Sequence, residues 1–340
     1  MADMELKRKN NIVFIVPSLV LGGHEFQTVE VINDYIDKYP ENEIVILASN
    51  EVFLEHLPKA VRPRVRLCSF PQGNIISLLL QLWNTRKILK ENISHENIVI
   101  VSGGTVETVI YYSLIIRMLS LRAVECIGYI PMYVDKRLLR PRFGCLHNLV
   151  IDLASKLADR YITINRIQAK IISHHFQRPV SVIRNRVTSY PLVELDFGPR
   201  LVYCGRLDDV QKNITSLIKL LDDPRNPYTE LHIFGDGPAK NNVEDHVAAC
   251  KHLTVVMHGW CSGNEMHQYL GLRDILVMNS RWEGEPLVVK EFLSRGIQVI
   301  VPDIFGFRGM GINKKSKFTT KESLYEILNE KYNASLSQNI

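Results

Sequence analysis

Short apolar runs alternate with longer amphipathic stretches in the first half of this chain. Runs of mainly β-branched and aliphatic residues predict strands at 11–16, 43–48, 65–70, 97–101, 123–130 and 161–164. Between them, apolar residues recur every three or four positions, which predicts helices, most clearly at 25–38, 75–89 and 146–158. This alternation is typical of parallel βαβ units, so the first half is expected to form an α/β domain.

The same alternation starts again after a break. The segment 189–200 contains two prolines and a glycine between apolar patterns, which is typical of a linker. Beyond it, strands are expected at 201–204, 231–234, 253–257, 275–278 and 298–301, and helices at 214–221, 239–249, 265–270 and 287–294. The sequence therefore predicts two Rossmann-like domains, 1–190 and 191–340, which face a central cleft with the carboxyl ends of their strands.

Composition fits this picture of a globular protein. The chain has 340 residues, 46% of them hydrophobic and 23% charged, which suffices for two domains. The longest apolar stretch, 109–124, is interrupted by Arg117 and Arg122, so no run reaches the roughly 18 residues of a membrane-spanning helix. The N-terminus has no apolar signal region, and the cysteines lack zinc-site spacing. We expect a cytoplasmic protein without a bound metal.

Charge differs between the two halves. Residues 1–190 carry 24 Lys and Arg against 17 Asp and Glu, whereas residues 191–340 carry 17 against 19. A basic half favours an anionic partner, such as a phospholipid surface or a phosphorylated acceptor, and solvated charge without a partner is the alternative. Nucleic acid is not among the expected partners.

Two groups of cations in the first half adjoin apolar or aromatic residues. The first follows the apolar stretch 75–80 and comprises Trp83, Arg86, Lys87 and Lys90. The second comprises Lys136, Arg137, Arg140 and Arg142, beside Tyr133 and Phe143. Cations next to apolar side chains predict weak, salt-sensitive contact with an anionic membrane at its cytoplasmic face. The alternative is that the apolar residues are core and the cations merely face water.

Four clusters of residues that could bind a ligand or take part in a reaction follow predicted strands. The first is the loop Gly-Gly-His-Glu, in which Gly22 and Gly23 would let backbone N–H groups approach an anion at a helix N-terminus. In the second, Arg206 ends a strand and Lys212 opens the next helix. Two cations placed in this way can clamp a diphosphate and neutralise a leaving group without a metal. A tight turn without a ligand and a pair of surface cations are the alternatives.

The third cluster is Phe-Gly-Asp-Gly-Pro at 234–238. It is too short for the dinucleotide fingerprint, because Lys240 occupies the position of the last glycine. Together with Gly259 and Trp260 after the next strand, Gly235 could instead wall a nucleobase pocket. A simple strand-to-helix turn is the alternative.

The fourth cluster, 280–291, is the most specific. Glu283 lies in a loop, and Glu291 lies eight positions later within the following helix. The residues between them shape the loop and offer free backbone N–H groups to a phosphate at the first helical turn. These residues are Gly284, Pro286, Leu287 and Val288. Two solvated glutamates without a role are the alternative.

Taken together, these motifs make the chain similar to the retaining glycosyltransferases of family 4, which have the GT-B fold. The resemblance covers nearly the whole length, from the Gly-Gly-x-Glu loop at Gly22 to the strand and turn at 299–306. Its specific elements are Glu-x7-Glu, Gly-Arg-Leu and Gly-Asp-Gly-Pro.

The resemblance implies a role for each cluster. Arg206 and Lys212 would bind the diphosphate of a UDP- or GDP-sugar. Glu291 would hydrogen-bond the ribose, and Glu283 would face the donor sugar near its anomeric carbon. The glycines at 22–23 would let the acceptor-side loop approach the donor phosphate. Arg206, Lys212 and Glu283 are therefore the expected catalytic residues.

Two positions depart from the family pattern. Many relatives have a histidine after a strand near 128–131, where Tyr129 and Met132 stand here, so no catalytic histidine is assigned there. Glu285 occupies a position that is often apolar in relatives, which bears on sugar selection.

The implied activity is metal-independent, retaining transfer of a hexose or similar sugar to a glycan or lipid-linked acceptor, as in cell-surface polysaccharide synthesis. The leaving phosphate would help to deprotonate the acceptor in a front-face attack, and no separate cofactor is expected. Two rivals remain. One is a GT-B sugar-nucleotide epimerase, and the other is an inactive GT-B-like protein that binds a glycan or another subunit.

Overall fold

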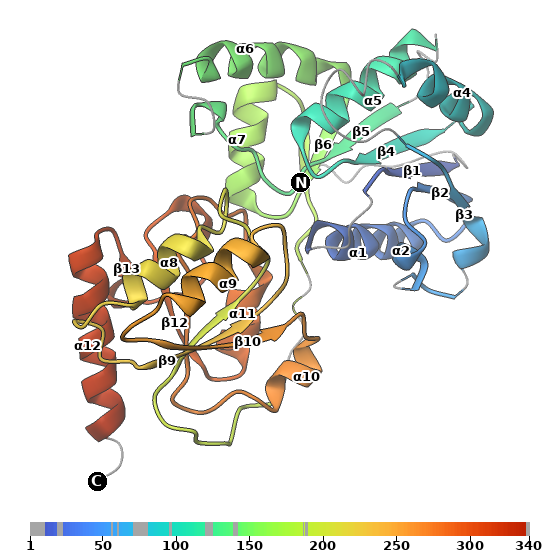
Figure 1. Cartoon of the computed structure of the whole chain (residues 1–340). Helices are drawn as coiled ribbons and strands as arrows, with labels where there is room; N and C mark the ends of the chain where they lie inside the picture. The colour runs from blue at the N-terminus through green and yellow to red at the C-terminus, as the bar shows by residue number, and fades with distance from the viewer. Residues whose placement is uncertain are drawn as a thin grey trace. The chain divides into compact units, whose positions relative to one another are not determined.

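The chain divides into two compact units, Met1–Arg186 and Val187–Ile340, each a parallel sheet flanked by helices (Figure 1). The sequence placed this boundary at 190. The computed structural model describes residues 11–18, 23–55, 57–59, 61–70, 81–94, 97–119, 125–138, 142–185, 187 and 190–337.

The N-terminal unit contains a seven-stranded sheet in the order β3-β2-β1-β4-β5-β6-β7. Its strands are β1 Ile12–Val16, β2 Ile44–Ala48, β3 Val65–Leu67, β4 Ile98–Ser102, β5 Glu125–Tyr129, β6 Arg160–Thr163 and β7 Val180–Val182. Its helices are α1 Gly23–Lys38, α2 Val52–Glu55, α4 Leu82–Asn92, α5 Val106–Met118, α6 Gly144–Ala154 and α7 Arg166–Phe176. Short 3-10 turns lie at Arg62–Arg64, Lys136–Leu138 and Ser155–Leu157.

The C-terminal unit contains a six-stranded sheet in the order β10-β9-β8-β11-β12-β13. Its strands are β8 Leu201–Cys204, β9 Glu230–Phe234, β10 Thr254–Gly259, β11 Ile275–Val277, β12 Gln298–Pro302 and β13 Lys317–Phe318. Its helices are α8 Ile214–Leu221, α9 Lys240–Ala248, α10 Gly263–His267, α11 Leu287–Ser294 and α12 Lys321–Ser337, with 3-10 turns at Phe305–Phe307 and Lys314–Ser316.

Apolar residues cover both faces of each sheet. In β1, Val13 and Ile15 pack with one apolar cluster and Ile12 and Phe14 with another, because successive side chains of a strand point to opposite faces. A strand buried on both faces reads as a continuous apolar run. This is why the central strands were recognisable in the sequence.

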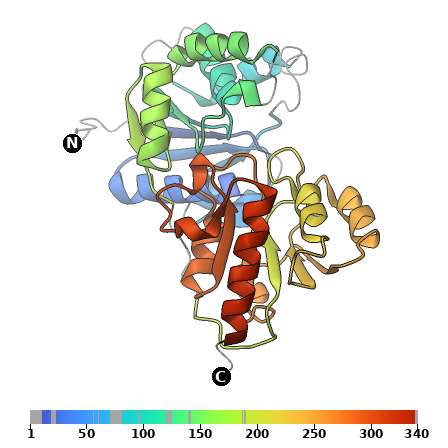
Figure 2. The same cartoon turned by 90° about the vertical axis from the view of Figure 1, so that its left-hand side faces the viewer.

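The last helix closes the core of the C-terminal unit. Leu324 and Leu328 of α12 belong to the same buried cluster as Leu217 of α8. The hydroxyl of Tyr325 donates a hydrogen bond to the carbonyl of Leu220 at 2.7 Å. Figure 2 shows α12 in red along one side of this unit.

Each predicted strand is present, with ends that shift by up to three residues. The described part of the expected helix 75–89 is α4, which begins at Leu82, and the expected residues 75–80 lie outside the described part of the chain. The sequence did not predict β7, β13, α2, α5, α7 or α12. Helix α5 is apolar on most of its surface and is buried at positions all along it, so it has no clear helical period.

Candidate active site

The loops that follow β8, β9, β10 and β11 gather at one edge of the C-terminal sheet, because parallel strands end on the same side. Backbone hydrogen bonds join these loops. The N–H of Gly205 donates to the carbonyl of Phe234 at 3.0 Å, and the N–H of Gly235 donates to the carbonyl of Gly259 at 2.7 Å. This edge carries most of the residues that the sequence assigned to the donor.

Gly235 has a packing role at this edge. A Cβ atom at Gly235 would lie 1.9 Å from the carbonyl oxygen of Gly205, and a Cβ atom at Gly237 would lie 2.5 Å from that of Leu207. Only glycine permits such a close backbone approach. Gly235 and Gly237 therefore fix the position of the loop that carries Arg206, while contact of Gly235 with a donor remains a prediction.

Lys212 and Glu283 form an ion pair, with Lys212 Nζ 2.6 Å from Glu283 Oε1. The side chains are 15% and 5% exposed. Gln211 Nε2 donates to the carbonyl of Trp282 at 3.2 Å and so holds the two loops together. The structure thus joins the loop after β8 to the loop after β11 at the residues expected to do the chemistry.

Arg281 strengthens the same junction. Its Nη1 donates to the carbonyls of Asp209 and Val210, and its Nη2 donates to Oδ1 of Asn213. Asn213 has a φ of +55° and is the N-cap of α8, so Lys212 lies two residues before the helix and does not open it. Asn213 adopts a left-handed conformation directly before α8, and the hydrogen bond from Arg281 fixes the Asn213 side chain.

The two cations of the predicted clamp have different partners. Arg206 is exposed, and its Nη2 lies 2.9 Å from Oδ2 of Asp208, whereas Lys212 contacts Glu283. Surface ion pairs are weak, so an anionic ligand can compete for the Arg206 guanidinium. A diphosphate that engages Lys212 has to compete with a largely buried carboxylate.

Glu291 lies in α11, as expected, and is partly buried. Burial raises the pKa of its carboxyl group, and the nearby positive charge of Arg295 opposes this shift. Pro286 is the N-cap of α11 and not part of its first turn, and no side chain caps the helix. The first N–H groups of α11, those of Leu287 and Val288, therefore have no intrahelical acceptor and point out of the helix end.

Two flanking positions complete the edge. Trp260 follows β10 and its side chain is 69% exposed, while Gly259 has a φ of +71°, which favours glycine. Glu285, the departure from the family pattern, forms an ion pair with Lys290 of α11. Glu285 is thus engaged within its own loop and helix, next to Gly284.

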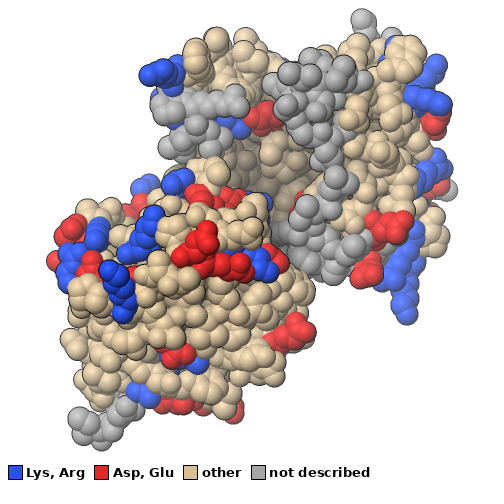
Figure 3. All heavy atoms as spheres, viewed as in Figure 1, with Lys and Arg blue, Asp and Glu red and all other residues tan. Residues whose placement is uncertain are grey.

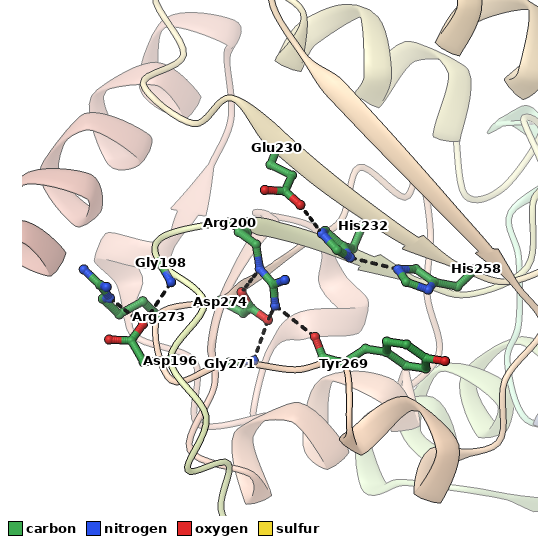
Figure 4. A network of polar contacts seen from close by, with 10 residues as sticks. All are labelled: Asp196, Gly198, Arg200, Glu230, His232, His258, Tyr269, Gly271, Arg273 and Asp274. Carbon is green, nitrogen blue, oxygen red and sulfur yellow. Dashed lines mark hydrogen bonds and ion pairs between the residues drawn. The ribbon is translucent and has the colours of Figure 1, made fainter.

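A polar network joins side chains of β9 to the end of β10 (Figure 4). His232 Nδ1 lies 2.8 Å from His258 Nε2, and His232 Nε2 lies 2.5 Å from Oε1 of Glu230. These contacts are satisfied when each histidine donates from Nε2, and burial together with the neighbouring His232 and Arg200 lowers the pKa of His258. His258 is therefore fixed as a neutral ring two residues before Trp260.

A second network holds the start of β8 in place. Arg200 makes two hydrogen bonds to the buried carboxylate of Asp274, at 2.9 and 2.8 Å, and one to the carbonyl of Tyr269 (Figure 4). The ring of Tyr269 packs against His258, with ring centroids 4.9 Å apart. Both networks stabilise the sheet behind the candidate donor site.

The N-terminal unit has a polar cluster at the carboxyl ends of its central strands. His24 Nε2 lies 3.1 Å from Oγ of Ser102, the last residue of β4, and the His24 ring stacks on Tyr129, the last residue of β5. Ser102 Oγ also lies 2.5 Å from Oγ1 of Thr28. Burial lowers the pKa of His24, and its Nδ1 has no hydrogen-bond partner. A histidine thus does lie beside Tyr129, although it comes from another part of the chain.

The glycine loop before His24 is only partly described. Gly23 is the first residue of α1 rather than a loop residue, and Gly22 lies outside the described residues. Within the described ranges, no group of three or more His, Cys, Asp or Glu side chains is arranged to hold a metal ion.

The C-terminal half of the chain is similar to a known protein family. Residues 196–339 match the family model of glycosyl transferases group 1. The matched residues lie within the C-terminal unit. Sulfoquinovosyl transferase SQD2 of Arabidopsis thaliana is 30% identical to this chain over 112 residues, and the match covers 31% of this chain and 21% of that protein. The match therefore spans about a fifth of the length of that relative.

Solved structures resemble the whole chain. The lipopolysaccharide outer core galactosyltransferase WaaB has a TM-score of 0.64 at 19% identity, covering 95% of this chain and 90% of that one. HepE of Anabaena, solved with UDP and glucose, has a TM-score of 0.65 at 14% identity, covering 94% and 89%. These likenesses confirm the expected GT-B fold of two parallel-sheet α/β domains.

Sequence reasoning missed two features of the site. It treated Arg206 and Lys212 as one clamp, and it did not connect Lys212 with Glu283, which is 71 residues away. It also noted His24 only as part of a loop. The one sequence signal for the polar cluster at His24 was that β1, β4 and β5 all end near polar residues.

Proposed function

We propose that this protein is a retaining glycosyltransferase of family 4, which transfers a sugar from a UDP- or GDP-sugar to a glycan or lipid-linked acceptor. The observation that carries the proposal is the Lys212–Glu283 pair at the carboxyl edge of the sheet in the unit that matches the glycosyl transferases group 1 model. A buried ammonium there can bind a diphosphate, and the carboxylate it releases can orient the donor sugar.

The site offers the other groups that this reaction needs. The exposed Arg206 guanidinium can join Lys212 on the diphosphate and stabilise negative charge on the leaving group. The N–H groups of the first turn of α11, which no side chain of the N-cap residue Pro286 accepts from, favour an anion at the same edge. Glu291, partly buried in α11, can accept hydrogen bonds from ribose hydroxyls.

The proposal is tested by measuring acceptor-dependent release of UDP or GDP over a panel of nucleotide sugars, with the anomeric configuration of the product read by NMR. Arg206→Ala and Lys212→Ala should each lower kcat/KM about 30- to 1000-fold, which corresponds to about 2–4 kcal/mol of lost transition-state stabilisation. A chelator should have little effect on the wild-type rate.

Arg225→Ala is a matched control for Arg206→Ala. Arg225 is also an exposed arginine that pairs with an aspartate two positions away, Asp223, but it lies outside the candidate site. It should keep wild-type turnover. An inverted product or wild-type turnover in both site variants would contradict the proposal, and epimerised sugar nucleotide without an acceptor would favour the epimerase.

The proposal includes weak contact with an anionic membrane that presents the acceptor. Trp83 is 75% exposed and Arg86 lies over its ring, 5.5 Å from the centroid, which is a suitable arrangement for a lipid headgroup region. Lys136 is less suited, because its Nζ lies 2.6 Å from Oε1 of Glu107. None of the described helices combines the length and the hydropathy that a bilayer-crossing segment requires.

The remaining members of the second basic group differ in position. Tyr133 stacks on His175 with ring centroids 4.5 Å apart, whereas Arg142 and Phe143 are exposed. Arg137 is exposed and pairs with Asp135. Arg140 and the apolar stretch 75–80 lie outside the described residues. Arg86→Glu with Lys87→Glu should weaken binding to anionic vesicles, and unchanged binding would exclude α4 from the contact.

A further inference from the structure

Helix α6 has its polar and apolar faces reversed. Its outward residues are apolar, and four of them recur at helical spacing with 55–63% exposure: Leu146, Leu149, Val150 and Leu153. Phe143, directly before the helix, is 70% exposed. Surface helices normally place such residues toward the core, so this stripe is not explained by the packing of the unit.

The polar residues of α6 face the protein instead. Asn148 donates to Oδ1 of Asp135 at 2.8 Å, and Asp152 Oδ2 lies 3.1 Å from Nδ1 of His175. His147 Nε2 lies 3.6 Å from Oε1 of Glu107. These contacts fix the rotation of α6, so the apolar stripe cannot turn inward without breaking them.

An exposed cation that suits anionic headgroups adjoins the stripe. Arg142, beside Phe143, is exposed, whereas the exposed Arg137 is paired with Asp135. The carboxylates near the stripe each have a partner. Asp135 pairs with Arg137, Glu107 pairs with Lys136, and Asp152 of α6 contacts His175. In Figure 3 the described surface over α6, at the top left, is mostly uncharged, with basic atoms at one end.

The stripe is too small for a stable interface between two copies of the chain. Helix α6 has 11 residues, which is about 16 Å at roughly 1.5 Å per residue. A strip of that length and about 10 Å wide covers on the order of 160 Å², against roughly 800 Å² per partner in a standard interface. Its leucines and valine also differ from the Trp, Tyr and Arg that dominate protein interfaces.

We propose that α6 lies in the surface of an anionic bilayer, with the stripe Phe143, Leu146, Leu149, Val150 and Leu153 inserted between headgroups and acyl chains. This is the geometry of an interfacial amphipathic helix. The inference rests on the membrane contact proposed above and not on sugar transfer. It predicts that binding has an apolar component, which salt does not screen, in addition to the electrostatic one.

The test is cosedimentation of the full chain with vesicles of phosphatidylcholine, alone or mixed with phosphatidylglycerol, at low and at high salt. The wild-type protein should bind the anionic vesicles and keep part of this binding at high salt. Combined Leu146→Gln, Leu149→Gln and Leu153→Gln should lower the partition coefficient at least about tenfold, since inserted leucines contribute apolar transfer free energy. These side chains are exposed, so the variant should fold, which its thermal unfolding checks.

The matched control replaces exposed leucines of the other unit, Leu192, Leu272 and Leu336, by glutamine. It should bind vesicles as the wild type does. The proposal is overturned if the wild type ignores anionic vesicles, if the α6 variant binds them unchanged, or if α6 instead mediates a concentration-dependent dimer that lipid does not affect. Binding of UDP or GDP by calorimetry should be equal in all three proteins. If the wild type bound neither nucleotide, this would count against the proposed function alone.

Discussion

The ammonium group of Lys212 lies 2.6 Å from the carboxylate of Glu283, and the pair spans two loops that are far apart in the sequence. Removal of one partner leaves a buried charge without compensation. Lys212→Ala should therefore lower the free energy of unfolding by about 3–5 kcal/mol. Urea denaturation followed by circular dichroism measures this loss.

Lys136→Ala is the comparison for this prediction. Lys136 forms a similar pair with Glu107 in the other unit, but Glu107 is 38% exposed and can be hydrated when unpaired. The free energy of unfolding should fall clearly less in Lys136→Ala than in Lys212→Ala. Lys212→Met combined with Glu283→Leu should recover much of the stability without recovering turnover, and equal losses in both lysine variants would argue against a special cost at Glu283.

The two glutamates of the Glu-x7-Glu element should separate binding from turnover. Glu291→Ala should mainly raise the Kd for UDP, because a ribose hydrogen bond is present in the ground state and in the transition state alike. Glu283→Gln should mainly lower kcat, and it should leave UDP binding equal or tighter because Lys212 is no longer neutralised. Calorimetry and steady-state kinetics measure the two effects, and the opposite division would reverse the assigned roles.

Gly306 controls the position of Glu283 without contributing a polar group. A Cβ atom at Gly306 would lie 2.1 Å from the backbone carbonyl oxygen of Glu283. Gly306→Ala should therefore displace the loop after β11 and reduce kcat at least about tenfold, since small misplacements of catalytic groups are costly. Gly311→Ala, where no atom lies within 4 Å of the added Cβ, should cost only backbone strain and keep most of the activity.

Acidic pH should destabilise the N-terminal unit through His24. Burial lowers the pKa of His24 below its ordinary value of 6.5, so the unfolded chain binds a proton more readily than the folded chain. Stability should be full above about pH 6.5 and should fall as pH decreases toward the lowered pKa, by up to about 1.4 kcal/mol per pH unit. Urea unfolding at several pH values measures this dependence.

His24→Gln keeps a donor for Ser102 and removes the titration. The slope of stability between neutral pH and pH 5 should become smaller in this variant, while the contribution of His258, whose pKa is also lowered, remains. An unchanged slope would show that His24 is protonated at little cost in the folded protein.

Sequence patterns were sufficient for the sheets because the central strands are buried on both faces. The strand β4, Ile98–Ser102, is buried at every position and reads as an uninterrupted apolar run up to Ser102. The edge strand β7, Val180–Val182, is only partly buried and three residues long, so neither its composition nor its length distinguishes it from a loop.

The site was predictable as a set of loops but not as a set of contacts. Strand ends locate Arg206, Lys212 and Glu283 at one edge of a parallel sheet, and this much follows from topology. Which cation meets Glu283 depends on the left-handed turn at Asn213 and on the hydrogen bonds of Arg281, which no periodicity reveals. The reversal of α6 escaped for a similar reason, because an amphipathic pattern does not state which face turns inward.

Among the described residues, each apolar cluster lies wholly within one unit, and α12 completes the C-terminal core from the same side of the boundary. Each unit therefore has a complete apolar core of its own. A chimera joined after residue 186 would keep both cores intact, so the chemistry at Lys212 and Glu283 could be paired with a new acceptor half by recombination alone. Evolution of a new linkage would then require no repacking of the domain that holds the donor.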